Sequence, residues 1–377
     1  MSKNILITGG AGFIGSNLSL KLINNGYNVT VLDNLSEQIH GNALESPLYK
    51  SIKDKVNFIK GDVRSKDDWR IALKGQDIVV HYAAETGTGQ SMYEISKYID
   101  VNVGGTANLL DILTNESHQV KKIIVASSRA LYGEGRYDCS KHGIVYPNAR
   151  EVNDMKMGDF NCKCPVCHSN VTLVATDENS KIHPSSIYGI TKQNQEQMVL
   201  NIGKALGISS IALRYQNVYG PGQSLSNPYT GILSIFSNLI RNNEPINIFE
   251  DGKESRDFVY IDDVVEATFQ AIEFDQKIYD VFNVGTGIPT SVTEVVSLLI
   301  SAYKSNIDYK ITGNFRIGDI AHNYADNTKI EKTLGFKPKV YFKQGIKLFA
   351  DWVNQQDIVF NGYKKSIEEM KEKGLFK

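Results

Sequence analysis

The chain lacks the features that mark several large classes of protein. Lys and Arg number 41 and Asp and Glu 42 in 377 residues, so no basic excess points to nucleic acid as the main partner. No apolar run approaches the roughly 20 residues needed to cross a bilayer. The N-terminus also lacks the long apolar stretch of a signal peptide. We therefore expect a globular cytoplasmic protein without a membrane or nucleic-acid partner.

Cysteine is absent from most of the chain, and all four cysteines lie between Cys139 and Cys167. In a reducing compartment such clustering suggests a metal before a disulfide. Two ligand pairs with x2 spacing, Cys-x2-His and Cys-x2-Cys, can meet one tetrahedral Zn²⁺ from tight turns. The predicted ligands of this structural zinc are Cys139, His142, Cys164 and Cys167. Cys162 competes for the fourth position, His168 is less favoured, and reduced free cysteines in a flexible loop are the alternative.

Apolar strands alternate with helical segments along most of the chain. Strands are expected over 4–8, 28–32, 56–59, 77–81, 121–127, 210–215 and 281–284, and helices over 16–25, 100–113, 185–206, 231–241, 262–272 and 344–353. This alternation predicts a Rossmann-type α/β fold, a doubly wound parallel sheet with helices on both faces. Ligands of such sheets bind at the carboxyl ends of the strands.

A glycine-rich turn, Gly9 to Gly15, follows the first expected strand and opens the first expected helix. Glycines let the backbone turn tightly and approach a pyrophosphate, and the helix N-terminus offers free N–H groups. Asp33 ends the next strand, 21 residues after Gly12, where a carboxylate can accept hydrogen bonds from the adenosine ribose. A carboxylate would repel a 2′-phosphate, so the pattern favours NAD over NADP.

Tyr188 and Lys192 stand four residues apart in an expected helix, so both side chains project from one face. A phenol has an ordinary pKa of about 10 and is a poor base at neutral pH. A nearby cation lowers that pKa. The pair therefore predicts a general acid or base that works near pH 7.

Taken together, these motifs resemble those of the extended short-chain dehydrogenase/reductase family, in particular its NAD-dependent nucleotide-sugar epimerases and dehydratases. The resemblance covers nearly the whole chain outside the cysteine-rich segment. The matching stretches are GGAGFIG (9–15), DNL (33–35), GDV (61–63), HYAA (81–84), VNVGGT (101–106), ASSRALYG (126–133), YGITK (188–192), LRYQNVYGPG (213–222), RDFVYIDDV (256–264) and RIGD (316–319).

The resemblance implies roles for individual residues. The catalytic set would be Ser128, with Ser127 as the alternative, Tyr188 and Lys192. The NAD-binding positions would be Gly9, Gly12, Phe13, Ile14, Gly15, Asp33, Asn34, Asp62, Val63, Ala83, Ala84, Asn102, Tyr188 and Lys192. The nucleoside-diphosphate sugar would be held by Asn217, Arg256, Arg316 and Asp319, although Arg316 and Asp319 can instead pair with each other.

The residues after Ser128 distinguish epimerase from dehydratase. The 4,6-dehydratases resembled here carry Asp-Glu at this point, whereas this chain has Arg129 and Ala130, neither of which can protonate a leaving hydroxyl. We therefore expect an isomerase that inverts carbon 4 through a transient 4-keto sugar. A UDP-glucose/galactose-type 4-epimerase and a keto-sugar reductase are the alternatives, and a non-enzymatic Rossmann binding protein is least favoured.

The cysteine-rich segment points to one group within the family that the chain resembles. Sequences that carry such an insert together with SSRA-x-YGEG (127–135) and Tyr-Pro-x-x-Arg (146–150) are similar to those of the dTDP-L-rhamnose 4-epimerase group. Two positions depart from that pattern: His142 replaces a more usual Cys, and Ala321 stands where Arg or Lys is common. The family also suggests a homodimer formed through the helices near 100–115 and 185–206.

These expectations divide the chain into four parts. An NAD-binding Rossmann domain would comprise 1–133, 177–216 and 256–286, interrupted by a zinc-ribbon-like insertion at 134–176. A smaller α/β domain for the nucleotide sugar would comprise 217–255 and 287–353. Residues 354–377 would form an amphipathic C-terminal helix.

Overall fold

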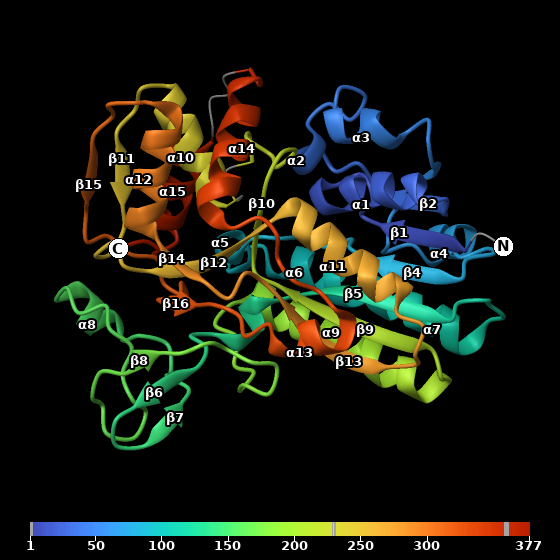
Figure 1. The fold of residues 1–377 in the computed structure, drawn as a ribbon, viewed down its shortest axis with the longest axis horizontal. Helices are drawn as coiled ribbons and strands as arrows, with labels where there is room; N and C mark the ends of the chain where they lie inside the picture. The colour runs from blue at the N-terminus through green and yellow to red at the C-terminus, as the bar shows by residue number, and fades with distance from the viewer. Residues whose placement is uncertain (1–2, 228, 230, 358–361) are drawn as a thin grey trace.

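A seven-stranded parallel sheet forms the larger half of the protein (Figure 1). The computed structural model describes residues 3–227, 229, 231–357 and 362–377. Across the sheet the strands are β13 (Tyr279–Val284), β9 (Ser209–Tyr215), β5 (Lys122–Ser128), β4 (Ile78–His81), β1 (Asn4–Thr8), β2 (Asn28–Asp33) and β3 (Asn57–Lys60). Every neighbouring pair is parallel, which confirms the predicted doubly wound fold.

Alternate strand residues pack against helices on the two faces of this sheet. Ile5 and Ile7 share a buried cluster with α1 (Phe13–Asn24) and α11 (Ile261–Glu273). On the opposite face, Leu6 packs with the helices α4 (Lys66–Ala72), α7 (Gly105–Asn115) and α9 (Ile187–Leu206). Because both faces are covered, the strands carry the continuous apolar runs from which the sheet was predicted.

A buried ion pair fixes α9 to the sheet. The Glu196 carboxylate on α9 accepts from Arg214 Nε at 2.9 Å and Nη2 at 2.5 Å, and from Ser127 Oγ at 2.6 Å. Arg214 also donates to the Tyr132 hydroxyl at 2.7 Å. A buried charge is tolerated only when it is fully paired, so these bonds set the rotation of the helix that carries Tyr188.

Short strands and helices make up the smaller half of the molecule. β10 (Asn217–Tyr219), β12 (Ser255–Tyr260), β14 (Pro289–Ser291) and β16 (His322–Asn323) form one sheet, and β11 (Ile246–Ile248) pairs with β15 (Tyr309–Ile311). The helices here are α10 (Ile232–Arg241), α12 (Val292–Tyr303) and α14 (Phe342–Asn354). Most of these two- to six-residue strands were not predicted, since so few residues carry no periodicity.

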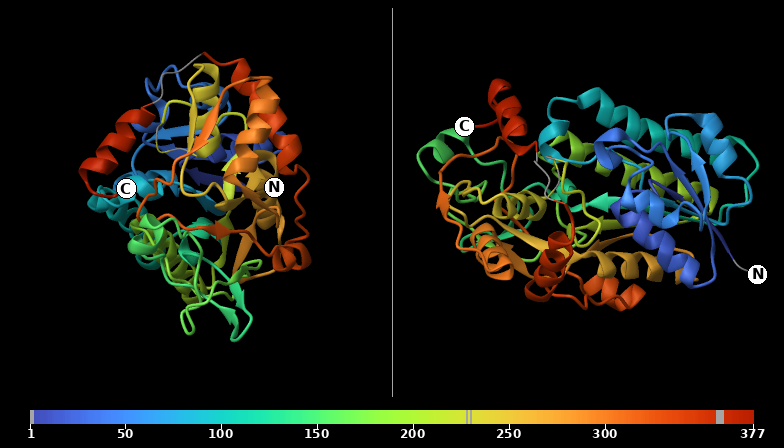
Figure 2. Two further views of the ribbon diagram at one scale, coloured as in Figure 1. Left: turned by 90° about the vertical axis from the view of Figure 1, so that its left-hand side faces the viewer. Right: turned by 90° about the horizontal axis from the view of Figure 1, so that it is seen from above.

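The cysteine-rich insertion projects from the body, and its strands and loops are drawn in green at the lower left of Figure 1. Its core is a three-stranded antiparallel sheet of β7 (Gly143–Val145), β6 (Tyr137–Cys139) and β8 (Thr172–Leu173), accompanied by α8 (Val152–Lys156). The left panel of Figure 2 shows this sheet and its loops below the main sheet and the smaller half.

The C-terminal segment is helical over only part of the range expected. α15 occupies Tyr363–Glu372, and residues 358–361 of the expected helix lie outside the described residues. The last residues are extended: Phe315 and Lys377 exchange two backbone hydrogen bonds of 3.0 Å.

The remaining short elements are α2 (Glu37–His40), α3 (Pro47–Ile52), α5 (Thr88–Ser91), α6 (Ile95–Tyr98), the π-helical turn η1 (Ile99–Gly104), the 3-10 turn η2 (Arg129–Tyr132) and α13 (Thr328–Leu334). Within the described ranges, no helix combines the length and apolarity that a membrane crossing requires.

Candidate active site

A groove of about 1030 Å³ runs past the carboxyl ends of β1 to β5 and β9. Most of the residues singled out from the sequence line it. They are Gly9, Gly12, Phe13, Ile14, Gly15, Asp33, Asn34, Asp62, Val63, Ala83, Ala84, Ser128, Tyr188, Lys192 and Asn217. The sheet topology therefore brings together residues as far apart in sequence as Phe13 and Asn217.

The glycine-rich turn is shaped for a close approach by a ligand. Gly9 has φ +67°, and a Cβ there would lie 2.8 Å from the backbone nitrogen of Ala83. A Cβ at Gly15 would lie 2.4 Å from the Gly9 carbonyl oxygen. Among the residues that the structure describes, no side chain caps the first turn of α1 behind Gly12. Uncapped N–H groups at a helix N-terminus are a binding site for phosphate, so this end of the groove fits the pyrophosphate of a dinucleotide.

Two carboxylates follow the glycine turn along the groove. Asp33 accepts from the backbone nitrogens of Ala11 at 3.0 Å and Leu35 at 2.8 Å, and burial raises its pKa. Hydrogen bonds from Arg64 hold the pKa of Asp62 at about 2. Asp33 thus fixes the glycine turn, and each carboxylate keeps lone pairs that can accept from a hydroxyl or an amine of a dinucleotide.

Tyr188 stands at the N-terminal end of α9, which begins behind Ser186 as its N-cap. The Ser186 hydroxyl accepts from the backbone nitrogen of Gly189 at 3.1 Å. Burial raises the pKa of Tyr188, while a hydrogen bond with Ser128 and the charge of Arg129 act to lower it. The sequence predicted a lowered pKa driven by Lys192. In the structure, desolvation of the phenol is the larger effect.

Lys192 lies one turn after Tyr188 and is 3% exposed. Its Nζ donates to the carbonyl oxygen of Ala126 at 3.0 Å and stands 6.0 Å from the centre of the Tyr188 ring. Burial lowers the pKa of Lys192 to about 7. The ammonium still has donors free to hold a ribose hydroxyl, but its charge is not fixed at neutral pH.

Arg129 is a groove residue that the sequence analysis used only as evidence against dehydration. It lines the groove beside Ser128 and Tyr188, and its Nε donates to Asn217 Oδ1 at 2.7 Å. Among the described residues, its other two nitrogens have no hydrogen-bond partner. The sequence signal that could have identified Arg129 as a groove residue is its position directly after Ser128, because residues that follow a parallel strand lie at the same edge of the sheet.

Four predicted binding residues lie outside the residues that line the groove. Asn102 is fully buried behind it, where its side chain bonds to the backbone of Glu85 and to Thr191 Oγ1. The Arg256 guanidinium donates to three backbone carbonyls instead of projecting freely. Arg316 and Asp319 form an ion pair of 3.4 Å, which is the alternative that the sequence left open.

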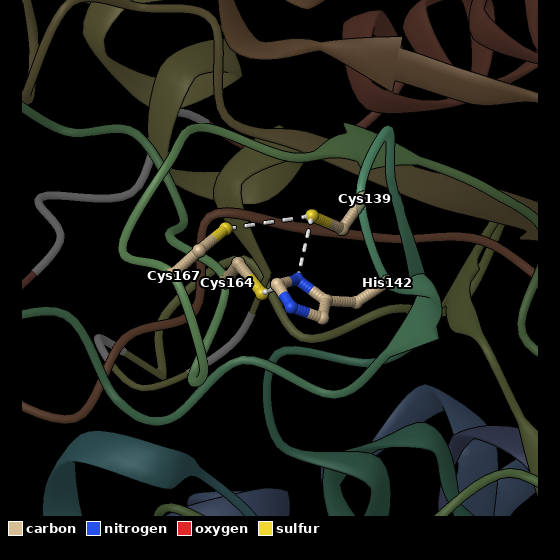
Figure 3. Close-up of side chains that lie close together, drawn as sticks. All are labelled: Cys139, His142, Cys164 and Cys167. Carbon is tan, nitrogen blue, oxygen red and sulfur yellow. Dashed lines mark hydrogen bonds between the residues drawn. The ribbon is translucent and has the colours of Figure 1, made fainter.

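The insertion gathers three cysteines and one histidine at a single point (Figure 3). The ligand atoms of Cys139, His142, Cys164 and Cys167 all lie within 4.8 Å of one another. Cys139 Sγ is 3.7 Å from Cys167 Sγ and 3.6 Å from His142 Nδ1, and Cys164 Sγ is also 3.6 Å from that nitrogen. Ligands about 2.3 Å from a zinc ion stand about 3.7 Å apart on a tetrahedron, so the cluster fits Zn²⁺.

Cys162, the competing ligand, points away from this cluster. Its Sγ lies within hydrogen-bond distance of Tyr137 Oη, at 3.3 Å, and of Glu134 Oε2, at 3.5 Å. The geometry therefore favours His142 over Cys162 as the fourth ligand.

Several known proteins have similar sequences and folds. One relative, dTDP-L-rhamnose 4-epimerase of Burkholderia thailandensis, is 36% identical over 94% of this chain and 96% of its own. UDP-glucose 4-epimerase of Thermotoga maritima, solved with UDP-glucose, has a TM-score of 0.74 and 31% identity over 93% of this chain and 99% of its own. UDP-glucuronic acid 4-epimerase of Bacillus cereus, solved with UDP-glucuronic acid and NAD, has a TM-score of 0.76 and 26% identity over the same shares.

A family model covers most of the chain as well. It matches residues 5–149 and 166–285, which hold the glycine turn, Ser128, Tyr188 and Lys192, and it omits only part of the insertion between these two ranges. Sequence motifs, sheet topology and relatives of nearly full length agree. On these grounds the chain belongs to the NAD dependent epimerase/dehydratase family.

Proposed function

We propose that this protein is an NAD-dependent 4-epimerase of nucleoside-diphosphate sugars, with dTDP-L-rhamnose as the first substrate to test. The observation that carries the proposal is the convergence of Ser128, Tyr188 and Lys192 on one groove that also holds the glycine turn. Bound NAD⁺ would supply a hydride acceptor that later returns the hydride to the opposite face of the sugar. The choice of sugar rests on the relative from Burkholderia thailandensis and on the sequence of the insertion.

The residues of this chain would perform the proton transfer. Tyr188 takes the proton of the carbon-4 hydroxyl as the sugar is oxidised and gives it back when the 4-keto sugar is reduced. Ser128 hydrogen-bonds to the same oxygen, and Lys192 holds the nicotinamide ribose. Arg129 keeps a positive charge beside the phenol, which favours the phenolate that acts as the base.

The experiment that tests this function follows carbon-4 stereochemistry by NMR in dTDP-L-rhamnose, UDP-glucose and UDP-glucuronic acid. We expect one of these sugars to interconvert with its carbon-4 epimer without a net change in NADH absorbance at 340 nm. Oxidation of about one NADH for each sugar converted would instead identify a keto-sugar reductase. No conversion of any sugar by protein that contains NAD would contradict the proposal.

Replacing Arg129 with Ala is expected to move the rising limb of the kcat–pH profile to higher pH. The charge of Arg129 lowers the pKa of Tyr188, so its loss raises that pKa and the phenolate forms only in more alkaline solution. The measurement is kcat across pH 6–10. Arg136→Ala serves as the control, because Arg136 pairs with Asp177 away from the groove. Superimposable profiles for Arg129→Ala and the parent would contradict this role.

We also propose that the insertion binds one structural zinc through Cys139, His142, Cys164 and Cys167. Four protein ligands leave no open coordination position, so the metal would stabilise the fold and take no part in the reaction.

We also propose that the protein forms a homodimer through the surface of α6, η1, α7 and α9. Ile95, Ile99 and Ile190 are 37–47% exposed on this surface, and a molar mass near 84 kDa by light scattering, twice the 42.0 kDa of the chain, would support it.

A further inference from the structure

The loop Gly318–Ala321, hereafter the 318–321 loop, completes the core of the cysteine-rich insertion. Ala321 is 2% exposed and packs in one buried cluster with Tyr137, Cys139, Cys162 and Cys164. A larger side chain at this position would have to displace that cluster, which accounts for the small residue where the resemblance led us to expect Arg or Lys. The metal ligands and the loop therefore share one small core.

Two buried charges tie the insertion to the same loop. Glu134 Oε2 accepts from the backbone nitrogen of Ala321 at 2.7 Å. Arg150 Nη2 donates to the carbonyl oxygen of Asp319 at 2.9 Å, and its Nε donates to Glu134 Oε1 at 3.2 Å. The side chains of Glu134 and Arg150 are each only 3% exposed. These contacts hold the loop backbone from the insertion side.

The guanidinium of Arg150 uses its full set of donors. Beyond Asp319 and Glu134, it donates from Nη2 to Glu250 Oε1 at 3.0 Å, from Nη1 to Glu250 Oε2, and from Nη1 to the Phe160 carbonyl at 3.4 Å. Five N–H groups thus meet five acceptors. A lysine at this position would keep the charge but could not reach all of these acceptors.

The same loop also bonds to two side chains outside the insertion, Arg256 and Ser185. Arg256, a predicted diphosphate ligand, donates to the carbonyl oxygens of Ile320 at 2.6 Å and Ala321 at 2.8 Å. Ser185 Oγ donates to the Gly318 carbonyl at 3.1 Å, one residue before the N-cap of α9. A shift of the loop would therefore move a substrate-binding guanidinium and the entry to the catalytic helix.

We propose that the insertion is a positioning element for nucleotide-sugar binding, which acts through Glu134, Arg150 and the 318–321 loop on Arg256. This inference rests on the proposed epimerase function and adds to it. Metal binding by Cys139, His142, Cys164 and Cys167 would order the insertion core around Ala321. The loop carbonyls would then hold Arg256 in the orientation that binds the diphosphate.

Arg150→Lys tests the link without removing the buried charge. We expect KM for the nucleotide sugar, and Kd for UDP or dTDP in calorimetric titrations, to rise about tenfold, as the loss of one charge-assisted hydrogen bond implies. kcat and NAD content should stay near the parent values, since Arg150 touches neither Tyr188 nor the glycine turn. Lys163→Gln is the matched control, because within the described part of the chain the Lys163 ammonium pairs with Asp154 and Asp159, both inside the insertion.

The unmodified protein gives a second test that does not depend on a variant. Removing the metal with a chelator should weaken UDP or dTDP binding about tenfold and increase hydrogen exchange at 316–321, while bound NAD is retained. Equal nucleotide affinity for Arg150→Lys and the parent, or unchanged affinity and exchange after chelation, would overturn the inference. Nucleotide titrations need no turnover, so they test this link even if the proposed reaction fails.

Discussion

Replacing Tyr188 with Phe is expected to lower kcat by a factor of about 10³, within the range that general acid–base catalysis contributes. The change removes one hydroxyl and leaves the ring that packs in the groove. Proton removal from the sugar alcohol then lacks its proposed base, since Lys192 Nζ stands 6.0 Å from the centre of the Tyr188 ring and donates to the Ala126 carbonyl oxygen. Nucleotide-sugar affinity and NAD content should change little.

The measurement is kcat by the carbon-4 NMR assay, together with Kd for the nucleotide sugar. Tyr303→Phe is a matched control that removes a hydroxyl from α12, outside the residues lining the groove. A Tyr188→Phe protein with the turnover of the parent would show that another group moves the proton, and the assignment of the acid–base residue would be wrong.

Replacing Cys164 with Ser is expected to abolish metal binding and unfold the insertion. Cys164 is fully buried and supplies one of the four clustered ligand atoms. Zinc binding contributes roughly 10–16 kcal/mol in zinc-finger peptides, and a three-stranded sheet of two- and three-residue strands has little other core. The parent should contain about one zinc per chain by elemental analysis, and the variant close to none.

Cys162→Ser is the control that separates a metal effect from a general cysteine effect. Cys162 lies in the same buried cluster but bonds to Glu134 and Tyr137, so this variant should keep its zinc and resist proteolysis within 134–176. Metal retained in Cys164→Ser, or absent from the parent purified without chelators, would contradict the proposed site.

The parts of the protein governed by local sequence were predictable. Continuous apolar runs such as 4–8 and 121–127 predicted the parallel sheet, and parallel topology placed Asp33, Asp62 and Ser128 at one edge. The two-residue spacings within the Cys139–His142 and Cys164–Cys167 pairs predicted the cluster of four ligand atoms. Each of these predictions depends on residues close together in the chain, or on the rule that strand ends meet in a parallel sheet.

Features set by distant contacts were not predictable. The sequence indicated that Lys192 lowers the pKa of Tyr188, but burial depends on the packed fold and raises it instead. Arg256 carries the motif expected of a phosphate ligand, yet its guanidinium bonds to carbonyls of a loop more than sixty residues later. The small side chain at position 321 is explained by the packing of the insertion core against Ala321, which the sequence does not show.

Ala321 also bears on the order in which the protein assembles during synthesis. All four metal ligands have left the ribosome once residue 167 has emerged, whereas the bond from Ala321 to Glu134 spans 187 residues and forms much later. Contacts between distant parts of a chain wait for the later part to be made. The nascent insertion could therefore bind the proposed zinc ion while one side of its core is still open, and the proposed nucleotide-sugar site would be completed last.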